Sequence, residues 1–229
     1  MSAVAPRQLD FVRPFAYVFE DPEWLRKILI GGLFYLAGFF IVGWFFILGY
    51  AAQTTRNVIA GREHPLPEWD DLGNYFAEGL RIAGVWLVYM LPLFFLFGAL
   101  IVPAVMMGAL AGNENEAGQV IATGMTGCIY CLMFPLMLAL MAWMPAVMLR
   151  VAVRQTFASA FEFRVIWRFI RGNVANYLLA IVVWMVARFI GGFGVMFFCI
   201  GVIFTGFWAF LITAHAFAQA WLLSATHEA

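Results

Sequence analysis

Charged residues are scarce in this chain, and apolar residues dominate it. Asp, Glu, Lys and Arg make up 11% of its 229 residues, whereas apolar residues make up 65%. Soluble globular domains contain about 45–50% apolar residues, so this composition excludes one. The apolar runs are also continuous, whereas a transmembrane barrel needs alternating segments of about ten residues. Helices are the remaining structure that satisfies the backbone inside lipid, so the sequence predicts an all-α, polytopic membrane protein.

Net charge and cysteine are also lacking. The formal net charge is zero, so no global field attracts nucleic acid, and we expect no nucleic-acid partner. The three cysteines all lie in apolar runs and predict no disulfide framework. Cys128 and Cys131 lack the accessible, electropositive setting and the further ligands that redox or metal chemistry needs. We therefore expect no bound metal and no cofactor.

Lysine and arginine are missing from the short connections between apolar segments. These connections are residues 42–43, 111–118 and 199–201. Twelve of the thirteen basic residues lie instead in residues 1–27, 50–81 and 150–171. By the positive-inside rule, both termini and every long loop are cytoplasmic. We expect a multi-pass protein of the cytoplasmic (inner) membrane, N-in and C-in.

The long apolar runs cover residues 28–50, 82–110, 120–149 and 174–223. The last run would make a helix about 75 Å long, far more than the ~30 Å hydrocarbon core, so it must fold back. Clustered glycines weaken a helix, and they place the turn near residues 198–201 or, alternatively, at residues 191–194. The last run therefore predicts a tight hairpin.

The first run is predicted to be a hairpin as well. A single crossing would put the basic N-terminal arm and residues 150–171 on opposite sides of the membrane. Two helices, residues 22–41 and 44–60, joined by a turn at residues 42–43, remove that conflict. Each has about eighteen residues, the short end of the spanning range. We expect six membrane helices, with the first pair short enough to be re-entrant.

The expected organisation is a single membrane domain over residues 1–229. Its parts are an interfacial helix at 8–21, the first hairpin at 22–61, a cytoplasmic loop and helix at 62–81, the central hairpin at 82–149, an interfacial helix at 155–172 and the last hairpin at 174–223.

The second interfacial helix is amphipathic. Apolar residues recur at helical spacing from Phe157 to Phe169, while Arg164, Arg168 and Arg171 share another face. Aromatic side chains opposite arginines are typical of a helix in the headgroup plane, so we expect contact with membrane lipid. The alternative is a helix packed on the bundle, whose arginines only set the orientation.

A distinctive loop follows the first hairpin and contains Pro65, Pro67, Trp69, Asp70 and Asp71. The prolines impose an extended path, either aspartate can cap a helix that begins near residue 72, and the tryptophan suits an interfacial anchor. These carboxylates could instead join His64 in a cation site, but no recognised ligand spacing is present. The sequence favours capping and anchoring.

Polar groups are rare inside the runs, and none of the runs contains Asp or Glu. Arg188 is either near mid-membrane, where it would bind carbonyls, a lipid phosphate or an anion, or near the outer interface, where it snorkels. His215 and Gln219 share a helix face and form a polar patch with Thr213. Hydrogen bonding between helices is the favoured role of this patch, with a ligand or proton role for His215 as the alternative.

Several local sequences resemble one prokaryotic membrane family, catalogued as domain of unknown function 4013. They are Asp21-Pro-Glu-Trp-Leu-Arg-Lys27, Leu48-Gly-Tyr50, Arg56-Asn-Val-Ile-Ala-Gly61, Pro65-Leu-Pro-Glu-Trp-Asp-Asp71, Glu78-Gly-Leu-Arg81 and residues 161–177. The resemblance implies a polytopic membrane fold and transfers no activity. In the family the first run often has a central proline, where this chain has Ile41-Val-Gly43.

Three functions compete at this point. The first is a non-enzymatic scaffold, assembly factor or accessory subunit that interacts with lipid and with other membrane subunits or a second copy. The second is a transporter or lipid-handling protein, although coupled transport normally uses buried carboxylates. An intramembrane enzyme ranks last because convergent titratable groups are nearly absent, so we expect no catalytic residue.

Overall fold

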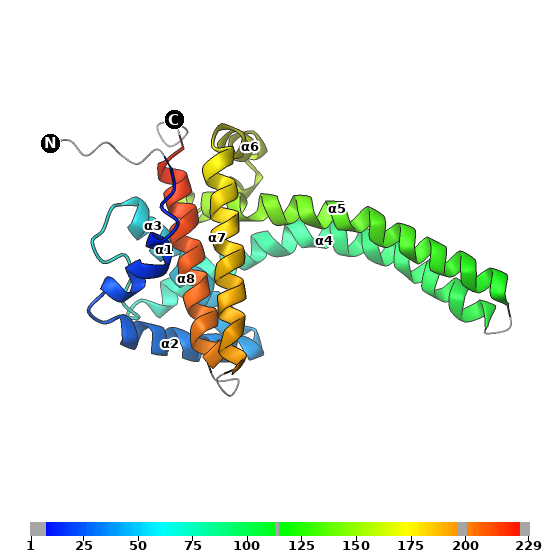
Figure 1. The fold of residues 1–229 in the computed structure, drawn as a ribbon, viewed down its shortest axis with the longest axis horizontal. Coiled ribbons are helices and arrows are strands. Elements are labelled where there is room, and N and C mark those ends of the chain that lie inside the picture. Colours follow the sequence, from blue (N-terminus) through cyan, green and yellow to red (C-terminus); the bar gives the residue numbers. More distant parts are fainter. Residues whose placement is uncertain (1–7, 113–114, 197–200, 225–229) are drawn as a thin grey trace. The chain divides into compact units, whose positions relative to one another are not determined.

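The computed structural model describes residues 8–112, 115–196 and 201–224 (Figure 1). Within these residues the chain is all-α. Its eight α-helices are α1 (Arg13–Ala16), α2 (Trp24–Ala37), α3 (Val42–Ile59), α4 (Leu72–Ala111), α5 (Glu116–Arg154), α6 (Phe163–Gly172), α7 (Val174–Phe193) and α8 (Gly201–Leu222). Short 3₁₀ turns are η1 (Tyr17–Glu20), η2 (Gly38–Phe40), η3 (Phe157–Phe161) and η4 (Gly194–Met196).

The chain divides into two compact units. The first comprises Met1–Ala83 with Pro145–Ala229, and the second comprises Gly84–Met144. Helices α4 and α5 each contribute one part to both units. The first unit contains the termini, both short hairpins and all of the loop sequences described above.

Helices α7 and α8 lie side by side in the first unit (Figure 1). Small residues allow this approach: a Cβ atom on Gly194 would lie 2.2 Å from the Thr205 hydroxyl, and one on Gly191 3.2 Å from Ala209. The Thr205 hydroxyl donates to the Gly191 carbonyl at 2.7 Å. Helix α7 ends at Phe193, within the glycine cluster of residues 191–194, and the chain continues as η4. The predicted turn residues 198–200 lie outside the described residues.

The first hairpin consists of α2 and α3, and α2 crosses the lower part of α8 in Figure 1. The turn lies at η2 and Ile41, one or two residues before the predicted position. Ile41 takes a positive φ of 69°, and a Cβ atom on Gly43 would lie 2.0 Å from the Phe34 carbonyl oxygen. Gly43, in the segment Ile41-Val-Gly43, therefore lies at a backbone contact.

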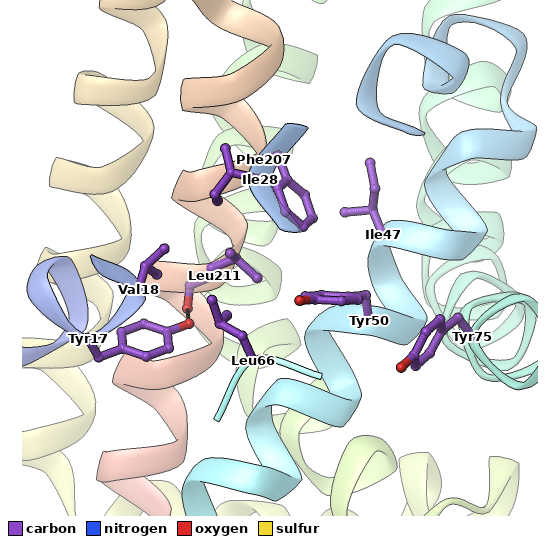
Figure 2. Packing of buried hydrophobic residues seen from close by; sticks show 9 residues of the cluster. All are labelled: Tyr17, Val18, Ile28, Ile47, Tyr50, Leu66, Tyr75, Phe207 and Leu211. Carbon is purple, nitrogen blue, oxygen red and sulfur yellow. Dashed lines mark hydrogen bonds between the residues drawn. The ribbon is translucent and has the colours of Figure 1, made fainter. Parts of the chain in front are cut away.

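Aromatic side chains fill the centre of the first unit. Figure 2 shows the buried cluster, in which Tyr50 from α3, Phe207 from α8 and Tyr75 from α4 converge. The Tyr50 ring centroid lies 5.6 Å from both of the other two. The loop residue Leu66 and Tyr17 of η1 complete the same cluster. Segments that are far apart in the sequence thus share one core.

Two glycines let α3 and α4 touch through their backbones. A Cβ atom on Gly49 would lie 1.9 Å from the Tyr75 carbonyl oxygen, and one on Gly79 would lie 1.7 Å from the Phe45 carbonyl oxygen. The contact is reciprocal, since each glycine faces the backbone of the other helix. Both glycines belong to the local sequences that carry the family resemblance.

The second unit is an antiparallel hairpin made of the apolar parts of α4 and α5. A small core of Ala104, Ile129 and Met133 joins the two helices. Near the tip, the Gln119 side-chain amide donates to the carbonyls of Gly108 at 2.8 Å and Gly112 at 3.0 Å. Most other side chains of this unit are exposed, so its helices present apolar surface on nearly every side.

Four described helices are long and apolar enough to cross a membrane: Leu72–Ala111, Glu116–Arg154, Val174–Met196 and Gly201–Leu222. The sequence predicts six spans, whereas four of the described helices have the length and composition of a span. The hairpin of α2 and α3 is present, but α2 has only 14 residues, and α3 ends in a polar turn that includes Arg56. Length and composition therefore separate this hairpin from the other four helices.

The predicted interfacial helices are shorter than expected. Residues 155–172 form η3 and α6 with a break at Glu162, whose carboxylate binds Arg150. Residues 8–21 become helical only at α1 and tighten into η1.

Prediction for the glycine crossing. Substituting Gly79→Ala should force α3 and α4 apart and lower the thermal unfolding midpoint in detergent micelles, because the added methyl group would overlap backbone. Gly73→Ala in the same helix is the matched control, since nothing lies within 4 Å of its Cβ position. Alanine has the higher helix propensity, so this control should be neutral or slightly stabilising. Equal midpoints for the two variants would contradict the crossing.

Candidate functional site

Side chains from neighbouring helices hold the loop before α4 through hydrogen bonds to its backbone carbonyls. Four consecutive carbonyl oxygens, those of residues 65–68, each accept a hydrogen bond from a different side chain. The donors are Asn57 to Pro65 (2.8 Å), Lys27 to Leu66 (3.1 Å), Tyr50 to Pro67 (2.8 Å) and Tyr75 to Glu68 (2.6 Å). The extended path that the prolines impose turns these carbonyls toward three different helices. We call residues 65–68, together with the four side chains that bind their carbonyls, the loop clamp.

Trp69 lies inside this clamp. Its ring stacks on Tyr50 at 4.1 Å and on Phe34 at 4.9 Å between centroids, and its indole N–H donates to the Lys27 carbonyl at 3.0 Å. The sequence predicted an interfacial anchor at this position. The structure packs the half-buried ring against the aromatic core and satisfies its indole N–H with a backbone carbonyl. The role as an interfacial anchor stays a prediction.

The two aspartates of the loop differ in role. Asp71 accepts a hydrogen bond from the Asn74 amide at 3.2 Å, which caps the first turn of α4 as the sequence predicted. Asp70 is exposed. Among the residues that the structure describes, no group of three or more His, Cys, Asp or Glu side chains is arranged to hold a metal ion. The alternative of a cation site in this loop therefore has no supporting geometry.

Lys27 is the centre of a buried ionic group that the sequence analysis did not identify. Its side-chain nitrogen lies 2.8 Å from Asp21 and 2.7 Å from Glu68, and it also donates to the Leu66 carbonyl. Lys27 is 4% exposed and Asp21 is 2% exposed. Burial alone would lower the pKa of the ammonium, but hydrogen bonds to both carboxylates raise it above its ordinary value. One signal was available: Lys27 is the only lysine in the chain.

A second buried ionic group joins α3, α4 and α5. Glu78, which is 4% exposed, accepts from Arg56 at 2.7 Å and from Gln155 at 3.0 Å. Arg56 also donates to the Ala152 carbonyl at 3.0 Å and to Gln53. Arg56 and Glu78 both lie in the local sequences that resemble the family. Their role here is to connect the base of the central helices to the first hairpin.

His215 and Gln219 tie the N-terminal arm to α8. The Gln219 amide nitrogen lies 3.2 Å from His215 Nδ1, and the Gln219 carbonyl oxygen accepts from the Asp10 amide at 3.0 Å. Thr213 donates within its own helix, to Ala209 at 2.7 Å. The Leu9 amide donates to Asn176 at 3.0 Å. Leu9 and Asp10 therefore lie against one end of the α7–α8 pair.

A polar cavity of about 550 Å³ lies beside His215. Arg13, Tyr17 and Glu20 line it from the N-terminal segment, and residues 61–65 line it from the loop. The sequence indicated His64 and His215 separately, and the structure places both on this cavity. In this cavity a ligand-sized space meets several titratable side chains.

The arginines of α6 are exposed, as lipid contact requires. Ile166 and Phe169 are buried and face the first unit. The exposed residues are Arg164, Arg168, Arg171, Phe163 and Trp167. At 100° per residue the two exposed aromatic rings lie directly beside the three arginines. This arrangement puts an aromatic edge and a cationic edge on the same exposed surface.

Arg188 is exposed on α7, five residues before the helix ends at Phe193. Its guanidinium carbon lies 4.5 Å from the centroid of the Phe210 ring. This contact is a cation–π interaction between the paired helices. No described carboxylate forms an ion pair with it.

The four apolar helices, together with the sparse and internally paired charges, define a multi-pass helical membrane protein. The particular family follows from comparison of the sequence with family models. The chain belongs to the family described as "Protein of unknown function (DUF4013)", whose model matches residues 32–200. No protein of curated function and no solved structure matches it. The matched region contains the loop residues 65–68 and the Arg56–Glu78 group, whereas Lys27 precedes it.

Prediction for the buried lysine. Lys27→Met should destabilise the protein by about 3–5 kcal/mol, because it leaves Asp21 buried without its partner. Lys27→Arg should also destabilise it, since a planar guanidinium cannot replace a compact ammonium that bonds three acceptors. Thermal unfolding in micelles measures both effects.

The control for this prediction is Arg26→Met at the neighbouring position. Arg26 makes an exposed ion pair with Glu23, with the two side chains 68% and 52% exposed, so its loss should leave the midpoint unchanged. A Lys27→Met variant as stable as Arg26→Met would contradict the role of the buried group.

Proposed function

We propose that this protein is a non-catalytic membrane scaffold or accessory subunit, which binds other membrane proteins and lipid through its central hairpin. The observation that carries the proposal is the exposure of α4. The most apolar stretch of α4 is only 6% buried, compared with 56% for α8. A surface of this kind suits lipid tails or the helices of a partner.

The use of charge in the first unit supports a non-catalytic role. The buried Lys27 and the half-buried Arg56 are each paired with carboxylates and backbone carbonyls, and the buried Arg150 is paired with Glu162. Catalysis needs titratable groups that converge on a reacting atom. These groups instead hold helices and loops to one another.

The proposed topology has six membrane helices with both termini on the cytoplasmic side of the prokaryotic inner membrane. Helices α2 and α3 form a re-entrant pair in it. The 14 residues of α2 reach about 21 Å, less than the ~30 Å hydrocarbon core. The tip is apolar and exposed: Phe39 is 87% exposed and Phe40 is 76% exposed. A tip of this kind fits a hairpin that enters lipid and turns back.

Membrane lipid is the first proposed partner, and α6 is the proposed contact. Arginine near anionic lipid contributes about 1 kcal/mol per residue, and Trp167 suits the headgroup level. Other subunits or a second copy of the chain are the proposed protein partners of the central hairpin.

A lipid-handling role is the second candidate. It is favoured by an apolar cavity of about 440 Å³ in the second unit, lined by Trp86, Phe94 and Phe97 of α4 and Met137 of α5. An acyl chain would satisfy this lining without any polar group.

Photo-crosslinking distinguishes the two candidates. A photoreactive amino acid at Phe95 or at Phe134, both exposed in the second unit, should capture the same membrane protein in cells. That protein should also co-purify in near-stoichiometric amount in lipid nanoparticles. The same probe at exposed Asn74 is the control. Lipid adducts alone at Phe95 and Phe134 would count against the scaffold, and a lipid adduct at Phe94 would support lipid handling.

Prediction for the re-entrant pair. In a variant without native cysteines, Phe39→Cys should resist a membrane-impermeant maleimide from either side and react only after detergent is added. Glu116→Cys at the start of α5 should react from outside, and Arg62→Cys only from inside. Reaction of the Phe39→Cys variant from outside would show that the first pair spans the membrane completely.

Prediction for the α6 arginines. Replacing Arg164, Arg168 and Arg171 together by glutamine should lower the amount of phosphatidylglycerol that remains bound after purification, by at least half. Mass spectrometry of the retained lipid measures it. The triple lysine variant keeps the charge and should retain most of the lipid, and Arg154→Gln is an exposed control outside α6. Unchanged retention in the triple glutamine variant would contradict lipid contact at α6.

A further inference from the structure

The polar cavity of the first unit has the size and composition of a ligand site. Its volume of about 550 Å³ falls within the range of about 300–1,000 Å³ for small-molecule pockets. Three segments that are distant in the sequence build its walls: the N-terminal segment, the loop that begins at Gly61, and α8. All of them belong to the same compact unit.

The hydrogen bonds around His215 determine which ring nitrogen carries its proton. The Gln219 carbonyl oxygen is engaged by the Asp10 amide, so the group that faces His215 Nδ1 is the Gln219 NH₂. An NH₂ group only donates, so Nδ1 accepts and Nε2 carries the proton. The residue is 5% exposed and lines the cavity. No described side chain or backbone group accepts from Nε2–H.

Tyr17 closes the wall beside this donor. Its ring centroid lies 4.3 Å from that of His215, and its hydroxyl donates to the Leu211 carbonyl at 3.0 Å (Figure 2). The tyrosine therefore fixes the plane of the imidazole, while its own hydroxyl is already used. His215 lines the cavity, and its Nε2–H has no acceptor among the described residues, so it remains available to a ligand.

The charged side chains of the cavity are two arginines and two glutamates, so their formal charges cancel. Arg13 is already paired with Glu20 through two contacts of 3.0 Å. Arg62 and His64 form no ion pair or side-chain hydrogen bond with the residues that the structure describes, so their donors remain available. Guanidinium groups match the geometry of phosphate oxygens. Glu63 also lines the cavity and disfavours a polyanion.

We propose that this cavity binds a single phosphate group, held by His215 Nε2–H, Arg62 and His64. The phosphate belongs either to a phospholipid headgroup or to a small soluble phosphate. Binding of phosphate at these residues does not depend on the scaffold role. The assignment to a lipid does depend on the proposed topology, in which this end of α8 faces the cytoplasmic headgroups.

The test uses the full chain, labelled with ¹⁵N-histidine, in a neutral detergent. The His215 side-chain signals are assigned by substitution of the other two histidines. Inorganic phosphate and glycerophosphoethanolamine are titrated in micelles, and phosphatidylethanolamine is tested in phosphatidylcholine nanodiscs. A shift of the His215 Nε2 signal with the soluble probes supports a soluble ligand. A shift only in nanodiscs with phosphatidylethanolamine supports a headgroup.

Arg62→Gln should weaken the binding that causes this shift at least tenfold, because it removes a charge-assisted hydrogen bond. Arg154→Gln removes an exposed arginine that does not line the cavity and should bind as the unaltered protein does. Two results would overturn the proposal. One is a His215 signal in the unaltered protein that does not shift with any of the phosphate probes. The other is equal affinity of Arg62→Gln and the unaltered protein.

Discussion

The first unit depends on one constraint: the positively charged side chain of Lys27 on α2 is buried, so its ammonium group needs acceptors within the protein. Lys27 meets this demand with three acceptors that come from two other segments, Asp21 before α2 and the loop at Leu66 and Glu68. The loop can supply them only while it runs extended, and its other carbonyls are then bound by tyrosine and asparagine side chains. Hydrophobic burial is non-directional and would not by itself fix this path. The ionic group makes the aromatic core specific for one arrangement.

The sequence predicts the helical class, the hairpins and the cap at Asp71 because these depend on local or periodic signals. Continuous apolar runs require helices in lipid, glycine clusters end them, and an aspartate before Leu72 accepts from the first turn. The family resemblance extends over the loop and the Arg56 region, and the family model confirms it. These features need no knowledge of which segments meet in space.

The remaining features were decided by tertiary contacts. Trp69 has the composition of an interfacial anchor, but its partners Tyr50 and Phe34 lie in other elements, so no local pattern reveals that it is stacked between them. The helix expected over residues 155–172 is broken at Glu162, whose partner Arg150 lies in α5. Gly49 and Gly79 meet only because α3 and α4 cross. Hydropathy detects the apolar run of residues 28–50, and it does not reveal that α2 has only 14 residues.

The tip of the first hairpin combines a strained backbone with an exposed apolar side chain at Ile41. Ile41 is β-branched and has a φ of 69° and a ψ of −41°, a sparsely populated conformation that costs such a residue about 1–3 kcal/mol. Its side chain is 68% exposed, so contacts within the unit do not repay that cost. Transfer of an isoleucine side chain from water to an apolar medium is worth about 1.5–3 kcal/mol. An isoleucine at this turn is therefore better accommodated in hydrocarbon than in water.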